Sequence, residues 1–278
     1  MPKRKANSLP AQVKAVRSAR LHTQRPLGRP DIVATQSQSV LPEVENNSQA
    51  SVLEDQQQHD NGYTYDNIFH VWVCGSSLVT GASNRASERP DGHNIGMENL
   101  GVKVTWLGMS GMRVHHLKET ISYHLQFNPK PDMLIIHCGG NDIRCQDRPG
   151  LELSWKLKKC IYDGNDDYDL NGDIESIQQK LPNCRMIYSQ ILPRLTWRYY
   201  ANHREIVNRI RKRVNSCIGA YTVRKGGGYI KYPNIIEDPR FFSDGTHLSS
   251  LGYDIKLYTI GSALYSFKCL GNSTFPVS

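Results

Sequence analysis

A short apolar run that stops at a glycine and two serines constrains this chain more than any other stretch. Residues 71–74 read Val-Trp-Val-Cys, and Gly75, Ser76 and Ser77 follow them. Such a run is typical of an inner strand in a parallel sheet that is covered on both faces. Ligands bind at the carboxyl ends of such strands, so Ser77 is a candidate nucleophile. Taken alone, the stretch is explained more simply as a turn with a helix cap.

From about residue 67, apolar runs alternate with longer amphipathic segments, a pattern that predicts an α/β fold with a central parallel sheet. After the first strand, we expect strands over residues 102–107, 133–138, 186–191 and 229–232. Helices are expected over residues 114–125, 151–161, 174–181, 199–218 and 249–267. The helix over 199–218 is expected to have a basic outer face, formed by Arg204, Arg209, Arg211, Lys212 and Arg213.

The chain of 278 residues has room for one domain and a tail. Residues 1–64 are rich in polar residues and predict a disordered tail, residues 65–270 the folded domain, and residues 271–278 a C-terminal tail. The net charge is +8, and the first 30 residues hold eight Lys and Arg with no acidic residue. This basic arm can contact nucleic-acid phosphates or act as a nuclear-import signal, although a solvated tail is the simpler explanation.

The remaining composition argues against secretion and against a metal site. The seven cysteines include no Cys-x-x-Cys pair, which favours reduced thiols over disulfides or structural zinc. No apolar run is long enough to span a membrane, and we expect an intracellular location, cytoplasmic or nuclear. Residues 167–178 follow the spacing of a calcium-binding loop, but Gln178 stands where such a loop needs Glu. An acidic solvated loop is the simpler interpretation.

Residues suited to acyl transfer follow several of the predicted strands. This chemistry needs a nucleophilic oxygen, a base, and donors aimed at the oxygen that becomes negative. Ser77 would attack, and the backbone N–H groups of Ser77 and Gly111 with the amide of Asn141 would form the oxyanion hole. His247 would be the base and Asp244 would orient its ring. Individually, Asp244 fits a turn residue and His247 a surface histidine.

In this order, these residues resemble the motif blocks of the SGNH, or GDSL-type, hydrolase superfamily. Residues 75–78, Gly-Ser-Ser-Leu, are similar to the block Gly-Asp-Ser-Leu that carries the nucleophile. Gly111 matches the glycine of the second block, residues 139–142 match Gly-x-Asn-Asp, and residues 244–247 match Asp-x-x-His. The resemblance covers residues 68–267.

The resemblance implies a three-layer α/β/α sandwich with esterase activity on a small-molecule or acylated substrate, without metal or organic cofactor. The chain departs from the family at Ser76, where Asp is usual, and this change bears on efficiency more than on mechanism. Residues 104–108, 137–142 and 191–194 look similar to members of this superfamily encoded by animal retrotransposons.

One further interpretation concerns the surroundings of the site, and another concerns a rival function. Arg194 and Trp197 follow a strand end and are candidates for lining the substrate pocket, although loop packing accounts for them as well. The rival function is a non-catalytic binding module of a mobile-element protein, which contacts nucleic acid through its basic tail and the basic helix around residues 204–213.

Overall fold

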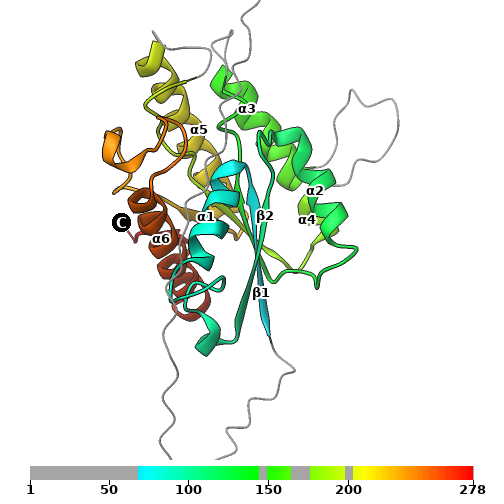
Figure 1. Ribbon diagram of the computed structural model, residues 1–278. Helices are drawn as coiled ribbons and strands as arrows, with labels where there is room; N and C mark the ends of the chain where they lie inside the picture. The colour runs from blue at the N-terminus through cyan, green and yellow to red at the C-terminus, as the bar shows by residue number, and fades with distance from the viewer. Residues whose placement is uncertain (1–67, 144–148, 164–175, 198–202, 278) are drawn as a thin grey trace, which may run out of the picture. The chain divides into compact units, whose positions relative to one another are not determined.

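The computed structural model describes residues 68–143, 149–163, 176–197 and 203–277 (Figure 1). The predicted N-terminal tail and residues 167–175 of the calcium-like loop lie outside these ranges. The strands are β1 (Phe69–Gly75), β2 (Val102–Gly108), β3 (Met133–His137), β4 (Arg185–Ser189), β5 (Gly228–Ile230) and β6 (Thr274–Phe275). The helices are α1 (Ser77–Ser87), α2 (Leu117–His124), α3 (Pro149–Lys158), α4 (Ile177–Lys180), α5 (Arg204–Arg224) and α6 (Ser250–Cys269). Short turns of other helix types cover Glu98–Leu100, Val114–His116, Lys159–Asp163 and Pro239–Phe241.

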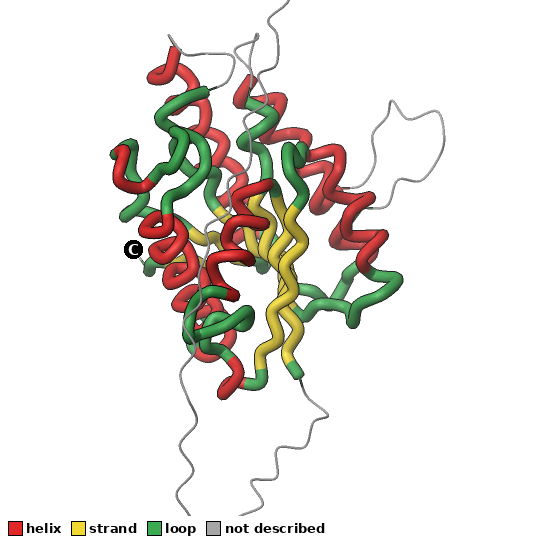
Figure 2. Tube along the Cα trace, viewed as in Figure 1, coloured by secondary structure: helices red, strands yellow, loops and turns green. Residues whose placement is uncertain are grey.

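The six strands form one parallel sheet in the order β2-β1-β3-β4-β5-β6, which confirms the predicted α/β class (Figure 2). The carboxyl ends of the first three strands lie side by side, because Gly75 is paired with Gly108 of β2 and with His137 of β3. The segments that leave these strands therefore start from one edge of the sheet.

Helices cover both faces of the sheet, as expected for a three-layer sandwich (Figure 1). Successive side chains of a strand point to opposite faces, so Val71 and Val73 of β1 pack with apolar residues of α1 and α6. Trp72 and Cys74 pack on the other face with residues of α2, α3, α4 and α5. These inner strands are apolar on both sides because both sides are buried.

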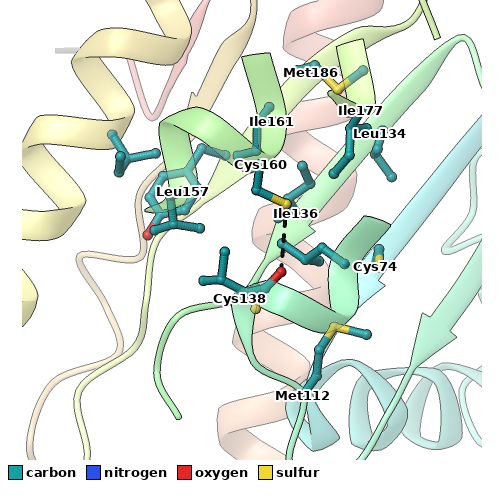
Figure 3. Packing of buried hydrophobic residues seen from close by; sticks show 14 of the residues in the cluster. Cys74, Met112, Leu134, Ile136, Cys138, Leu157, Cys160, Ile161, Ile177 and Met186 are labelled. Carbon is teal, nitrogen blue, oxygen red and sulfur yellow. Dashed lines mark hydrogen bonds between the residues drawn. The ribbon is translucent and has the colours of Figure 1, made fainter. Parts of the chain in front are cut away.

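Figure 3 shows part of the packing on the second face, where Leu134 and Ile136 of β3 belong to the same buried cluster as Leu157 of α3. Cys160 and Ile161, from the π-helical turn after α3, complete this contact, and both are buried. The thiol of Cys160 donates a weak hydrogen bond to the Val114 carbonyl, over 3.6 Å. This hydrogen bond joins the π-helical turn after α3 to the segment between β2 and α2.

Three features differ from the sequence-based expectations. The first helical turn after β2, Val114–His116, is a 3-10 turn, and α2 begins only at Leu117. Residues Thr274–Phe275 form an edge strand, β6, within the segment predicted as a C-terminal tail. Arg211 does not belong to the basic outer face of α5, since its side chain is buried and donates to the Ile191 carbonyl.

Three further observations on the described residues concern the cysteines, the helices and possible metal ligands. Six cysteines are free thiols: Cys74, Cys138, Cys160, Cys184, Cys217 and Cys269. No helix within the described ranges is long and apolar enough to cross a membrane. No cluster of three or more His, Cys, Asp or Glu suited to a metal ion occurs among the described residues.

Candidate active site

Ser77 is the first residue of α1 and lies directly after the end of β1. The turn between the two elements is tight, and a Cβ at Gly75 would lie 2.3 Å from the His137 carbonyl oxygen. Glycine is therefore required where β1 approaches β3. Ser76, the N-cap of α1, has extended backbone angles that turn the chain into the helix, which places Ser77 at the carboxyl edge of the sheet.

Three side chains form a continuous hydrogen-bonded chain at this edge. The Oγ of Ser77 lies 3.0 Å from Nε2 of His247, and Nδ1 of the same ring lies 2.6 Å from Oδ2 of Asp244. Because an ionised carboxylate only accepts hydrogen bonds, Nδ1–H donates to Asp244. The opposite nitrogen, Nε2, is then free to accept the hydroxyl proton of Ser77.

The loop that carries Asp244 and His247 is held in place by the backbone. An antiparallel bridge between Phe242 and Leu248 closes the loop. Gly245 has a φ of 80°, and its carbonyl accepts hydrogen bonds from the N–H groups of Leu195, over 2.8 Å, and Thr196, over 3.1 Å. These bonds fasten the loop to the segment after β4, so that His247 faces Ser77.

Asp244 remains ionised over the whole neutral range. Burial alone would raise the pKa of its carboxyl group, but hydrogen bonds from the His247 ring and from the backbone N–H groups of His247 and Thr246 oppose it. The backbone bonds measure 2.6 Å and 2.9 Å. The net effect lowers the pKa of Asp244 to about 2, so its negative charge is available to orient the imidazole.

The three predicted oxyanion donors lie around the same cavity. The N–H of Ser77 is an unpaired donor at the start of a helix, and neither it nor the N–H of Gly111 has a backbone acceptor within the described residues. Gly111 has a φ of 71°, which only glycine adopts readily. Asn141 donates one amide hydrogen to the Met112 carbonyl over 3.0 Å, which leaves its second hydrogen for a ligand.

Asp142 is a positioning residue that sequence reasoning did not assign. Its carboxylate accepts the backbone N–H of Val114, with both oxygens 3.3 Å away. It thereby ties the turn after β3 to the 3-10 turn that follows Gly111. Burial raises the pKa of Asp142, and the bond from Val114 opposes that shift.

A cavity of about 470 Å³ opens over this edge of the sheet. The sequence-predicted residues Ser77, Gly111, Asn141, Arg194, Trp197, Asp244 and His247 all line it. Ser110, Arg113, Ile143 and Thr196 also line the cavity without being singled out by a motif, and Gly140 and Thr246 line it from the variable positions of two motif blocks. Such residues come from loops whose spacing follows no period, which is why pattern analysis does not find them.

Two residues from the sequence analysis lie beside or beneath the cavity. Ser76 is buried and its side chain makes no capping bond to α1. His137, the last residue of β3, is buried, with Nδ1 3.0 Å from the hydroxyl of Ser189. Burial lowers its pKa well below the usual value, and Lys256 and Arg194 lower it further. His137 is therefore a neutral structural residue.

Comparison with known proteins shows the family to which the chain belongs. The sequence model of the GDSL-like Lipase/Acylhydrolase family matches residues 73–255, so the chain belongs to that family. This assignment agrees with the resemblance carried by the four motif blocks. A search of curated proteins found no match.

Several solved structures share the fold, and two of them illustrate the likeness. A candidate acylhydrolase from Bacteroides fragilis is 17% identical, with a TM-score of 0.50 over 72% of this chain and 88% of that one. A GDSL-like lipase from Bacteroides thetaiotaomicron is also 17% identical, with a TM-score of 0.50 over 71% of this chain and 88% of the other. At this level of identity the likeness concerns the fold.

Proposed function

We propose that this protein is a serine hydrolase that cleaves carboxylic or acetyl esters, with Ser77 as nucleophile, His247 as general base and Asp244 as the residue that orients the imidazole. The observation that carries the proposal is the chain of hydrogen bonds from Ser77 through His247 to Asp244, with distances of 3.0 Å and 2.6 Å. Membership of the acylhydrolase family supports cleavage of an ester bond.

In the proposed reaction, Nε2 of His247 takes the hydroxyl proton as Ser77 Oγ attacks the ester carbonyl carbon. The carbonyl oxygen becomes negative and is stabilised by the N–H groups of Ser77 and Gly111 and by the Asn141 amide. His247 then gives the proton to the departing alcohol, which leaves an acyl group on Ser77. A water molecule, deprotonated by His247, releases the acid and restores the serine.

Arg194 and Trp197 are proposed to form the substrate-binding wall of the cavity. The guanidinium carbon of Arg194 lies 4.9 Å from the centroid of the Trp197 ring, a cation–π arrangement that holds both side chains in place. Arg194 also donates to Oδ1 of Asn141 over 3.2 Å, so this wall touches a proposed oxyanion donor.

Hydrolysis of a series of p-nitrophenyl esters of increasing acyl length tests the proposal. Wild type should show turnover, and Ser77→Ala should lose it. Ser216→Ala, which removes an exposed hydroxyl from α5, is the matched control and should behave as wild type. Equal turnover by wild type and Ser77→Ala would refute the assignment of the nucleophile.

A second candidate function is a non-catalytic module that contacts nucleic acid, as in a retrotransposon-encoded, intracellular member of the superfamily. Four exposed basic residues on α5 favour it: Arg204, Arg209, Lys212 and Arg213. Together with the basic residues of the first 30 positions, they would bind phosphates without reading the sequence. Affinity for a random duplex should then fall steeply as salt rises. Absence of binding at low salt would eliminate this function.

A further inference from the structure

Arg194 lines the cavity with most of its hydrogen-bonding capacity unused. A guanidinium carries five N–H donors, and the bond to Asn141 Oδ1 is the one that Arg194 makes within the described residues. The side chain is half-buried, and burial lowers its pKa to about 10. A charge taken out of water normally finds a counter-ion or several acceptors.

Arg211 shows how this fold satisfies an arginine that has only a structural role. Its donors reach the Ile191 carbonyl over 3.0 Å and Asn208 Oδ1 over 3.1 Å, and Glu237 lies 3.7 Å away. Arg194 has no comparable set of partners within the described residues: the Asp244 carboxylate on the same cavity wall favours its charge but accepts no hydrogen bond from it. The contrast indicates that the unused donors of Arg194 serve a ligand.

Trp197 holds the guanidinium of Arg194 in place. Its side chain is only 4% exposed, and its buried Nε1–H has no acceptor among the described residues. The ring stacks against Arg194 and lines the same cavity. Because the Nε1–H is buried, a ligand oxygen in the cavity meets the open donors of Arg194 and not this N–H.

The charges around the cavity are also uneven. Arg113 lines it too, and neither Arg113 nor Arg194 forms an ion pair within the described residues. The carboxylate on the wall, Asp244, already accepts hydrogen bonds from His247 and Thr246. Asp142, which lies near Arg113, already accepts the N–H of Val114. Two cations thus face a cavity whose nearby carboxylates have other partners.

Resting on the function proposed above, we infer that the substrate is an anionic ester, whose carboxylate or phosphate group is bound by Arg194 next to the scissile carbonyl. Both groups present several oxygens in the spacing that a guanidinium recognises. The anion lies beside Asn141, so its binding places the ester carbonyl within reach of Ser77 and the oxyanion donors.

Three aryl acetates of similar size test this inference: 4-carboxyphenyl acetate, 4-carbamoylphenyl acetate and 4-acetoxyphenyl phosphate. In wild type, kcat/KM for the carboxylate should exceed that for the neutral amide by about 10- to 100-fold, the usual value of a hydrogen bond to a charged group. The phosphate ester, compared with the carboxylate ester, shows which anion fits better. Added salt should lower the preference for both.

Variants assign the preference to residues. In Arg194→Gln the ratio of carboxylate to amide should fall to near one, whatever the variant does to overall turnover through Asn141. Trp197→Ala removes the ring that holds the guanidinium in place, and it should lower the ratio about two- to tenfold. Lys130→Gln, an exposed change in the loop before β3 and at the opposite edge of the sheet, should leave the ratio unchanged.

The outcomes separate the two proposals. A ratio near one in wild type, with hydrolysis that still depends on Ser77, would overturn the anionic substrate and leave the esterase standing. A preference that survives in Arg194→Gln would also overturn it. Failure of Ser77→Ala to reduce hydrolysis of any of the three esters would overturn the esterase, and the anionic substrate with it.

Discussion

Lys256 is a fully buried lysine on α6, and replacing it with methionine should stabilise the protein at neutral pH. Its side chain has no exposed surface, and Nζ donates to the Leu78 carbonyl in α1 over 3.1 Å. It forms no ion pair within the described residues. Burial lowers the pKa of Lys256 from 10.5 to about 7. Methionine is unbranched and of similar length, so it fills the same space without charge.

The size of the effect follows from this pKa. Between pH 7 and pH 10.5 the unfolded chain holds the lysine proton and the folded chain releases it, so the free energy of unfolding rises with pH across that window. At about 1.4 kcal/mol for each pH unit, the buried lysine costs about 5 kcal/mol at pH 7 and nothing above pH 10.5. Loss of the bond to Leu78 costs about 1 kcal/mol at every pH. Lys256→Met should therefore be more stable by about 4 kcal/mol at pH 7, with the gain disappearing towards pH 10.

Urea unfolding followed by tryptophan fluorescence at several pH values between 7 and 10 measures this difference. Comparing variant with wild type at each pH cancels the titration of thiols and tyrosines, and staying at pH 7 and above keeps His137 neutral in both states. A difference that does not change with pH, or a variant less stable than wild type at pH 7, would refute the view that Lys256 is buried without a counter-ion.

The other predictions concern the site and the strand beneath it. Asn141→Ala removes an oxyanion donor and should lower kcat by about 100- to 1000-fold while the protein stays folded, and normal turnover would exclude that role. Asp244→Asn should lower kcat by about 10⁴-fold with little change in fold, and steady-state kinetics with circular dichroism would detect a smaller loss. Gly75→Ala places a Cβ 2.3 Å from the His137 carbonyl oxygen and should destabilise the protein by about 1–3 kcal/mol in urea unfolding; an unchanged midpoint would mean that β1 and β3 separate easily.

The positions of the strands along the chain could be predicted because the signal is local. Runs such as residues 71–74 and 133–136 are apolar throughout, which marks strands buried on both faces, and a glycine follows within three residues of each run. Ser77 lies far from Asp244 and His247 in the sequence, yet matching the three residues to motif blocks predicted side chains that the fold brings into hydrogen-bond contact.

Features set by tertiary contacts could not be predicted in this way. β6 has only two residues, too few for a periodic pattern. Arg211 and Lys256 are charged residues of the kind that normally face water, but each is buried and donates a hydrogen bond to a backbone carbonyl from another part of the fold. Arg113 lines the cavity from a loop, where no spacing rule places side chains.

The central claim is that Ser77 is a nucleophile activated by His247, and covalent labelling tests it most directly. The full-length protein is treated with a fluorophosphonate and the modified residue is located by peptide mass spectrometry. We predict one adduct, on Ser77, which is absent in Ser77→Ala and forms much more slowly in His247→Ala. Absence of an adduct in folded wild-type protein, or an adduct on another residue, would contradict the account.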